Sequence, residues 1–382
     1  MGKLLKALGA GEALTRYVGG AVRDDLLGLP VSDVDLATRL RPDEVVERLQ
    51  VAGIKAVPTG FDHGTITAVS DGHPYEITTL RRDVETHGRR ATVAFTDDWE
   101  EDAARRDFTI NALMADPVSG EIFDYFGGLG DLEKRHVRFI GDPFERIAED
   151  HLRILRFFRF HARFGLGEPD SAALEACARR ANDLMALSRE RIADELLKLL
   201  AVEDPAPTVR VMLDHGILKP VLPEIEPGSW TRLKALVEAE RECKFQREPL
   251  LRLAALMPRN AEVAGSVAAR LKLSNRARKR VACAADPEIP ADTRAAAYRL
   301  GVECVADRLL LAGRATEAKA ISRWHLPRLP ITGGQLIKRG LKEGPAVSRT
   351  LREIENRWVE AGFPSGAEFE AIVSNSLAAN FR

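Results

Sequence analysis

The amino-acid sequence predicts an α+β fold, with a mixed α/β head at the N-terminal end followed by an all-α remainder. Two observations support this prediction. Short β-like runs alternate with helical stretches up to residue 140, whereas helical patterns follow one another beyond Pro143. Glycine clusters at 127–130 and 141 mark the change. We therefore expect a head (1–140), a helical neck (141–200), and a helical body and tail (201–382).

The charge distribution is a third informative feature. The composition, with 45% apolar and 30% charged residues, excludes a disordered or fibrous chain. The formal net charge of −1 gives by itself no reason to expect a nucleic-acid partner. However, residues 1–140 carry 17 Lys+Arg and 24 Asp+Glu, whereas residues 141–382 carry 39 and 33. Such an asymmetry between halves can mark a charged substrate.

Cysteine usage and targeting signals bear on the compartment. The four cysteines form no CxxC pair and no Cys/His ligand spacing, which argues against a disulfide framework or a zinc site. The first 20 residues lack the apolar core of a signal peptide, and no run of about 18 apolar residues follows. We therefore expect a cytoplasmic protein without a membrane partner.

Apolar periodicity locates the individual elements. In the head we expect β-like runs at 16–18, 31–36, 65–69, 75–80, 91–95, 121–125 and 137–140, and helices at 21–27, 42–51 and 107–115. Beyond the head we expect helices at 144–164, 171–187, 189–200, 207–216, 250–257, 263–271, 276–285 and 346–361. Ser188 predicts the N-terminus of the helix over 189–200.

The first motif of chemical interest is Gly19-Gly20-Ala21-Val22-Arg23-Asp24, at a strand-to-helix junction. Paired glycines at such a junction let backbone N–H groups approach a phosphate, and Arg23 can add a charge-assisted contact. The alternative is a tight turn followed by a surface arginine. The hexapeptide alone does not decide between these two interpretations.

Ten residues later, Val31-Ser32-Asp33-Val34-Asp35-Leu36 places two carboxylates at alternate positions of an expected strand. Asp33 and Asp35 then share one face, where a pair of divalent cations would offset their repulsion. A lone pair of this kind is usually a solvated edge or turn, but its position after a Gly-Gly loop favours a metal site. Glu76 is the candidate for a third carboxylate on a neighbouring strand, or else an exposed strand residue.

Two further motifs are rich in arginine. In Arg105-Arg106-Asp107-Phe108-Thr109-Ile110-Asn111, the arginines suit a triphosphate and the aspartate suits ribose hydroxyls. The alternative is an Asp helix cap with solvated arginines. In the expected neck helix, one stripe carries Asp150, Arg153, Arg156 and Arg159.

The Asp150/Arg153 spacing can be a surface ion pair or a base reader. An Asp–Arg pair offers one acceptor beside a fork of donors. Cytosine and adenine each present an amino donor beside a ring-nitrogen acceptor, whereas uracil and guanine present a carbonyl and an N–H. One such pair could therefore accept C and A and reject U and G.

Together these motifs resemble the bacterial class II tRNA nucleotidyltransferases (CCA-adding enzymes) of the polymerase-beta-like nucleotidyltransferase superfamily. The resemblance covers about residues 13–200 and also includes DYFGGLGDL at 124–132 and SRERIADEL at 188–196. It implies a polymerase-beta-like head and template-independent addition of C, C and A to the 3′ end of tRNA. The implied substrates are CTP and ATP, and the implied cofactor is two Mg²⁺ ions.

The resemblance also implies residue roles. Asp33 and Asp35 would bind magnesium, with Glu76 approximately at the third acidic position. Nucleotide binding would involve Gly19, Gly20, Arg23, Arg106, Asp107, Asn111, Asp150, Arg153, Arg156 and Arg159. Residues 82–99 match the position of a flexible loop that switches specificity from C to A, although His87 and Arg90 depart from the usual pattern.

The body is expected to hold the tRNA acceptor end. Its basic cluster can meet phosphates or form a solvated helix face, and comprises Lys272, Arg276, Arg278, Lys279 and Arg280. Three alternatives to CCA addition stay open. They are an A-adding tRNA nucleotidyltransferase, a bacterial poly(A) polymerase, and a non-catalytic RNA-binding protein that has kept the nucleotidyltransferase fold. The oligomeric state is not predicted.

Overall fold

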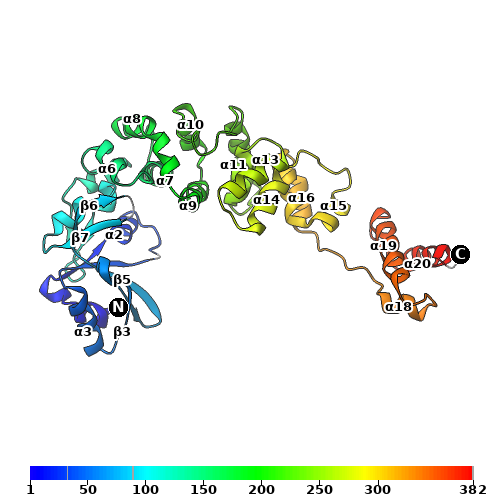
Figure 1. Cartoon of the computed structure of the whole chain (residues 1–382), viewed down its shortest axis with the longest axis horizontal. Coiled ribbons are helices and arrows are strands. Elements are labelled where there is room, and N and C mark those ends of the chain that lie inside the picture. Colours follow the sequence, from blue (N-terminus) through cyan, green and yellow to red (C-terminus); the bar gives the residue numbers. More distant parts are fainter. Residues whose placement is uncertain (32, 88–89, 381–382) are drawn as a thin grey trace. The chain divides into compact units, whose positions relative to one another are not determined.

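The computed structural model describes residues 1–31, 33–87 and 90–380 of the chain. The chain divides into two compact units, Met1–Pro223 and Glu224–Arg382. The first contains the mixed sheet, and the second is helical (Figure 1). The predicted α+β class is therefore confirmed. Within the described residues, no helix combines the length and apolar character needed to cross a membrane.

A seven-stranded mixed sheet forms the head. Its strands, in spatial order, are β3 (Lys55–Gly60), β4 (Thr65–Ser70), β5 (His73–Thr79), β2 (Asp35–Thr38), β1 (Thr15–Val18), β8 (Met114–Ala115) and β9 (Ile122–Phe123). Strands β2 and β5 pair in parallel, and all other neighbours are antiparallel. The parallel register sets Asp35 beside Glu76.

Two apolar clusters hold helices against the sheet. Leu4 of α1 (Gly2–Ala7) and Leu49 of α3 (Pro42–Val51) belong to one buried cluster with Leu36 and Ile77 of the central strands. Trp99, which begins α4 (Trp99–Ala104), belongs to a second cluster with residues of β1 and β8. Two short helices, α2 (Gly20–Leu26) and α5 (Gly128–Glu133), complete the head.

Several predictions for the head are wrong in detail. The expected helix over 107–115 is only a 3₁₀ turn, Thr109–Asn111, followed by β8. The expected strand over 137–140 reduces to one bridge between Phe108 and Phe139. Strand β2 begins at Asp35, so Asp33 precedes the strand and is not an alternating member of it.

The expected specificity loop over 82–99 contains a hairpin. Strands β6 (Arg81–His87) and β7 (Arg90–Phe95) pair antiparallel as a separate two-stranded sheet. Residues 88–89, between the strands, lie outside the described part of the chain. At the base of the hairpin, the Thr96 backbone N–H donates to the Leu80 carbonyl at 3.0 Å.

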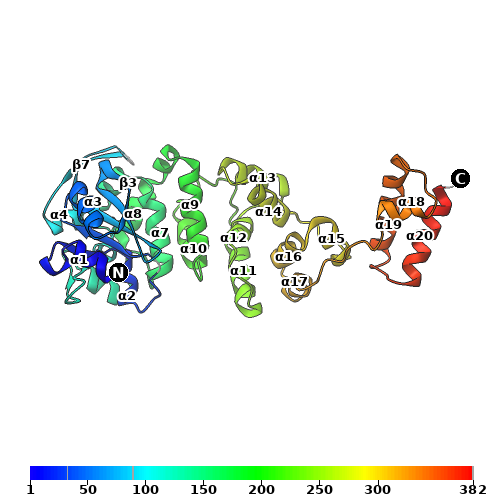
Figure 2. The ribbon, with the colours of Figure 1, turned by 90° about the horizontal axis from the view of Figure 1, so that it is seen from below.

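The neck is helical but does not contain the single helix expected over 144–164. Instead α6 (Pro143–Glu149) ends before Asp150, and α7 (Arg153–Phe164) begins three residues later. Helix α8 (Ser171–Arg179) precedes a 3₁₀ segment over Ala181–Ala186, and α9 (Arg189–Leu200) and α10 (Ala206–Asp214) follow. Helix α7 packs against both α9 and α10, as Figure 2 shows.

Helix α9 matches the prediction at both ends. Ser188 caps its N-terminus by accepting the Arg191 backbone N–H at 3.4 Å. Helix α7 is anchored by an aromatic cluster in which Phe108 and Phe157 both contact Phe139, with ring centroids 5.0 and 5.7 Å away. This cluster joins the neck to the segment that follows α4 in the head.

The second unit consists of ten helices within its described residues, 224–380: α11 (Ser229–Cys243), α12 (Pro249–Leu256), α13 (Ala261–Arg270), α14 (Asn275–Ala285), α15 (Thr293–Leu300), α16 (Val302–Leu311), α17 (Ala315–Ser322), α18 (Gly333–Lys338), α19 (Pro345–Glu360) and α20 (Ala367–Asn380). A disulfide joins Cys283 to Cys304, with Cα atoms 5.8 Å apart. The sequence argued against a disulfide framework because the four cysteines form no CxxC pair and no Cys/His ligand spacing, and this disulfide departs from that expectation.

Candidate active site

A cavity of about 800 Å³ in the first unit gathers most of the predicted site residues. All ten predicted nucleotide-binding residues line it, together with Asp33 and Asp35. Glu76 is not among the lining residues. The cavity wall also includes four residues that the sequence analysis did not assign to the site: Leu152, Phe160, Arg191 and Lys198.

The turn between β1 and α2 forms one wall. Gly19 has a φ of +69°, and a Cβ atom added there would lie 2.9 Å from Nη1 of Arg106. The positive φ favours glycine here, and the tip of the Arg106 side chain lies close to the space that a Cβ atom would fill. Arg23, one turn into α2, donates from Nε to Asp24 at 2.8 Å and from Nη1 to the Asn111 side-chain oxygen.

Asp33 and Asp35 line the same cavity and interact electrostatically. Burial raises the pKa of Asp35, Arg106 opposes this shift, and Asp33 adds to it. Burial also raises the pKa of Glu76, with a further contribution from Asp35, its partner across the parallel strands. These shifts indicate carboxylates whose negative charges are incompletely balanced by the protein.

The segment after α4 supplies Arg106, Asp107 and Asn111. Asp107 accepts the Asn111 side-chain amide and the Phe108 backbone N–H through Oδ1, each at 2.9 Å. Its Oδ2 accepts two N–H groups of Arg156, at 2.5 and 2.8 Å. Burial alone would raise the pKa of Asp107, but Arg156 and Asn111 outweigh it and lower that pKa.

These bonds explain why residues 107–115 do not form a helix. A short Asp side chain that binds its own neighbouring backbone competes with helical hydrogen bonding. Here the Asp107 carboxylate also has a partner on α7, Arg156, 49 residues along the chain. The contact with Arg156 is tertiary and could not be seen in the local pattern.

Helix α7 presents its arginines to the cavity, and α9 holds two of them. Glu195 accepts Nε of Arg159 at 2.6 Å and lies 3.8 Å from Nη1 of Arg156. The guanidinium of Arg159 also lies over the Phe160 ring, 4.4 Å from its centroid, and that of Arg23 lies 5.3 Å from the same centroid. Phe160 is therefore a shared apolar surface for cationic groups from α2 and α7.

Asp150 lies in the break between α6 and α7, so the prediction of one helix stripe is wrong for this residue. Its Oδ1 accepts the Leu152 backbone N–H at 3.1 Å, which closes the turn that starts α7. Its Oδ2 accepts Nη2 of Arg191 at 2.7 Å. Both carboxylate oxygens thus already have one partner, and further acceptor sites stay available on each.

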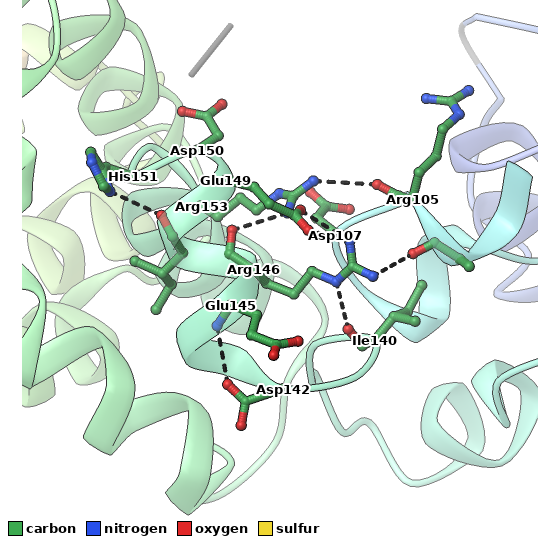
Figure 3. Close-up of polar contacts among 12 residues, drawn as sticks. Arg105, Asp107, Ile140, Asp142, Glu145, Arg146, Glu149, Asp150, His151 and Arg153 are labelled. Atoms are coloured by element: carbon green, nitrogen blue, oxygen red, sulfur yellow. Dashed lines mark hydrogen bonds and ion pairs between the residues drawn. The ribbon is translucent and has the colours of Figure 1, made fainter. Parts of the chain in front are cut away.

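Arg153, the first residue of α7, has a different set of partners from Asp150. Its guanidinium pairs with Glu149 and donates to the carbonyls of Arg146 and Arg105, at 3.0 and 3.3 Å. Figure 3 shows the Asp150 carboxylate directed away from the Arg153 guanidinium, although both residues line the cavity. Their separate partners therefore set the two orientations independently.

The cavity lining has a positive balance of charge. It contains seven cationic side chains and four carboxylates, which are those of Asp33, Asp35, Asp107 and Asp150. Carboxylates and arginines lining one cavity suit a ligand that combines phosphates with a polar ring. Within the described residues, no three His, Cys, Asp or Glu side chains gather closely enough to hold a metal ion by themselves.

The predicted tRNA-binding cluster lies in the second unit and is described by itself. Arg276, Arg278 and Lys279 are exposed on α14, and Lys272 is exposed just before it. Arg280 differs, because its side chain is only 19% exposed and pairs with Glu248, Glu303 and Asp307 at 2.8–2.9 Å. These carboxylates already occupy Arg280, so the structure argues against its predicted contact with phosphate.

Comparison with known proteins places this geometry in a family. The Poly A polymerase head domain model matches residues 15–138, and the model for a probable RNA and SrmB-binding site of polymerase A matches residues 168–228. The chain is 35% identical to mouse mitochondrial CCA tRNA nucleotidyltransferase 1, over 91% of this chain and 83% of the relative. The chain belongs to the CCA-adding tRNA nucleotidyltransferase family.

Two further similarities extend over nearly the whole nucleotidyltransferase chain. A CCA-adding enzyme of Streptococcus gordonii is 33% identical, over 92% of this chain and 90% of that protein. The crystal structure of the Bacillus stearothermophilus CCA-adding enzyme in complex with CTP aligns with a TM-score of 0.76 at 26% identity. That alignment covers 100% of this chain and 98% of the other.

Two of the four lining residues that the sequence analysis did not assign to the site, Arg191 and Lys198, lie on α9 of the nucleotidyltransferase. Arg191 and Lys198 are seven residues apart, which places them on one helix face. Glu195 lies on the same face and contacts the α7 arginines. The spacing was readable from the sequence, but the cavity that this face borders depends on the packing of α9 against α7.

Proposed function

We propose that the chain adds C, C and A to the 3′ end of tRNA from CTP and ATP, releasing pyrophosphate, in the cavity described above. The observation that carries the proposal is the convergence of motifs spread over residues 19–198 on one 800 Å³ cavity. The family membership supports the same reaction. A single cavity would serve both nucleotides in turn, with the growing tRNA end changing which one is accepted.

The arginines beside the Gly19–Gly20 turn are suited to the triphosphate. Arg23 and Arg106 lie beside the Gly19–Gly20 turn, and the absence of side chains there lets phosphate approach the backbone. Asn111 ties Arg23 to Asp107, so these groups are oriented before a nucleotide arrives. Pre-oriented donors contribute to catalysis because they need not reorganise during the reaction.

Asp33 and Asp35 are the proposed ligands of two Mg²⁺ ions. The fit rests on the donor chemistry: oxygen ligands suit Mg²⁺, and this ion is commonly held by one or two carboxylates plus substrate phosphates. The raised pKa of Asp35 is consistent with an acidic site awaiting a cation. When bound, Mg²⁺ supplies activation of the tRNA 3′-hydroxyl and stabilises charge on the phosphates. Glu76, paired beside Asp35, is the proposed third carboxylate.

Asp150 and Arg153 are the proposed base readers. Asp150 would accept the amino group of cytosine or adenine, and Arg153 would donate to the adjacent ring nitrogen. Arg156 and Arg159 would contact the nucleotide, and Asp107 with Asn111 would lie near the ribose. The partners of these side chains, Arg191, Glu149 and Glu195, support the proposal because they hold the readers in defined orientations.

The exposed cations of the second unit are the proposed contact with the tRNA acceptor end. Arg276, Arg278 and Lys279 lie on one short stretch of α14, with Lys272 nearby. Contacts with backbone phosphates would suit a protein that must accept every tRNA, since they carry little sequence information.

The experiment is extension of a tRNA that ends before CCA, using purified protein, Mg²⁺, and CTP, ATP or both. We expect two C residues with CTP alone and a complete CCA end with both nucleotides. A single A without prior C addition would indicate an A-adding enzyme, and a long A tract would indicate a poly(A) polymerase. Binding without extension would indicate a non-catalytic RNA-binding protein, and each of these three results contradicts the proposal.

A further inference from the structure

Arg146 of α6 connects three parts of the first unit without lining the cavity. Its Nε donates to the Ile140 carbonyl and its Nη2 to the Ala104 carbonyl, each at 2.8 Å. Its Nη1 contacts both carboxylate oxygens of Glu149, at 3.0 and 3.1 Å (Figure 3). Ala104 is the last residue of α4, so one guanidinium bridges the end of a head helix and the first neck helix.

The groups around Arg146 are the same ones that hold Arg153. Glu149 pairs with Arg153, and the Arg146 carbonyl accepts from Nη1 of Arg153. The third partner of Arg153 is the carbonyl of Arg105, the residue directly after Ala104. Arg146 thus holds Glu149 and the 104–105 backbone, and these two hold Arg153.

This arrangement leaves part of the Arg153 guanidinium for a ligand. Arginine has five N–H donors in a rigid planar fork, and the described protein partners take two on Nη1 and one on Nη2. The Nε–H and the second N–H of Nη2 remain. Because the fork is planar, fixing three donors also fixes the direction of the other two.

We propose that Arg146 is a positioning residue for base selection, which orients Arg153 through Glu149 and the 104–105 backbone. The inference rests on the proposed function in one respect, namely that Arg153 reads the incoming base. It goes further by assigning specificity to a residue that does not contact the nucleotide. It also links base reading to the segment that carries Arg106 and Asp107, which both line the cavity.

The test compares Arg146→Gln and Arg146→Lys in the full-length chain, with Glu145→Gln as the matched control. Glu145 is exposed on the same helix and its side chain lies outside the Arg146 network. Steady-state addition to a tRNA ending before CCA gives kcat and KM for CTP and for UTP, and thermal unfolding reports stability.

We expect Arg146→Gln to raise KM for CTP about tenfold and to reduce the preference for CTP over UTP by a similar factor, the effect of one weakened charge-assisted hydrogen bond. The kcat for CTP should change less than its KM, because the phosphate contacts persist. Arg146→Lys retains one donor and should recover part of the preference. Glu145→Gln should match the unaltered chain in both measurements.

A double-mutant cycle with Glu149→Gln tests whether Arg146 orients Arg153 through Glu149. If Arg146 acts through Glu149, the loss of preference in the double variant is smaller than the product of the two single losses. The proposal is overturned if both Arg146 variants lower the unfolding temperature but keep the preference for CTP. If Arg153→Ala itself leaves the preference intact, base reading by Arg153 fails first, which separates the proposed function from the present inference.

Discussion

The cationic side chains of the cavity are paired with carboxylates, whereas most of those on α14 are not paired within the described part of the chain. In the cavity, Arg23, Arg153, Arg156 and Arg159 each pair with a carboxylate of the first unit. On α14, the exposed side chains of Arg276, Arg278 and Lys279 make no ion pair or hydrogen bond with the described residues. Arg280, on the same helix, is paired like the cavity arginines.

The two arrangements would suit two kinds of recognition under the proposed function. A paired guanidinium has a fixed direction and can discriminate between ligands of similar charge, since misplaced donors lose hydrogen bonds. An exposed cation retains its freedom and binds any nearby phosphate, with a strong dependence on salt. Under the proposed function, the paired arginines of the first unit would select the nucleotide, and the exposed cations of α14 would bind tRNA phosphates.

The largest effect should follow from removing the acidic pair of the cavity. We expect Asp33→Ala or Asp35→Ala to reduce the rate of CTP addition by about 10³-fold or more, because several kcal/mol of metal-dependent stabilisation would be lost. Binding of tRNA should be nearly unchanged, as measured by filter binding. Chelation of Mg²⁺ with EDTA should have the same two consequences in the unaltered chain. An equal loss of binding and rate would contradict the metal role.

The preference for CTP over UTP should depend on Arg153, one of the two proposed base readers. We expect Arg153→Ala to reduce the preference for CTP over UTP by about 10- to 100-fold, the range for one well-placed pair of hydrogen bonds. Measured by primer extension with single nucleotides, the change should appear mainly as misincorporation. Arg189→Ala is a suitable control, because Arg189 lies on α9 and its side chain donates only to Met185 among the described residues. An unaltered preference in Arg153→Ala would remove it from base reading.

The affinity for tRNA should depend on the exposed cations of α14. We expect the triple variant Arg276→Gln, Arg278→Gln and Lys279→Gln to weaken tRNA binding about tenfold and to reduce the salt slope by about two to three. The loss should be similar for tRNAs of different sequence. Arg280→Gln is the internal comparison, since it should lower thermal stability without changing the salt slope. A salt slope unaffected by the triple variant would exclude these residues from phosphate binding.

The smallest effect concerns Asp307 of α16, the carboxylate that pairs with Arg280 of α14. Burial raises the pKa of Asp307 to about 6, Arg280 opposes the shift, and Glu303 and Glu248 add to it. The folded chain therefore holds this proton more tightly than the unfolded chain. The resulting stabilisation is complete below the ordinary pKa of 3.8 and is lost as the pH rises through about 6.

We accordingly expect the unfolding temperature to fall by about 2–4 °C between pH 5 and pH 7 through this group. Calorimetry of the unaltered chain and of Asp307→Asn measures it. The difference in unfolding temperature between the two chains should change from pH 5 to pH 7, because the amide side chain of the variant cannot titrate. Parallel curves for the two chains would show that Asp307 has an ordinary pKa.

Elements with a strong local pattern were predicted well. The helix over 42–51 was expected with the boundaries that α3 has, since Pro42 suits a first helical position and Val45 and Leu49 repeat at helical spacing. The helix over 189–200 matches α9 for the same reason, with Ser188 as its cap. Local hydrogen bonding and apolar periodicity are sufficient to define such elements.

Elements that depend on distant partners were predicted less well. The single helix expected over 144–164 is interrupted at Asp150, whose carboxylate closes a turn and pairs with Arg191 of α9. The helix expected over 107–115 is replaced because Asp107 pairs with Arg156 of α7. In both places a charged side chain gains a tertiary partner, and this outweighs a favourable local helical pattern.

The sequence by itself predicted the α+β class, the family, and twelve of the sixteen residues that line the cavity. The order and spacing of the motifs carry this information, because residue types suited to phosphate, metal and base appear at fixed separations. Only the tertiary structure decided which cations are held and which are exposed. Arg280 and Arg278 are alike in the sequence, yet one faces buried Asp307 and the other faces solvent. The direction and the partner of each arginine side chain depend on how the helices pack, so they cannot be predicted from the charge pattern along one helix.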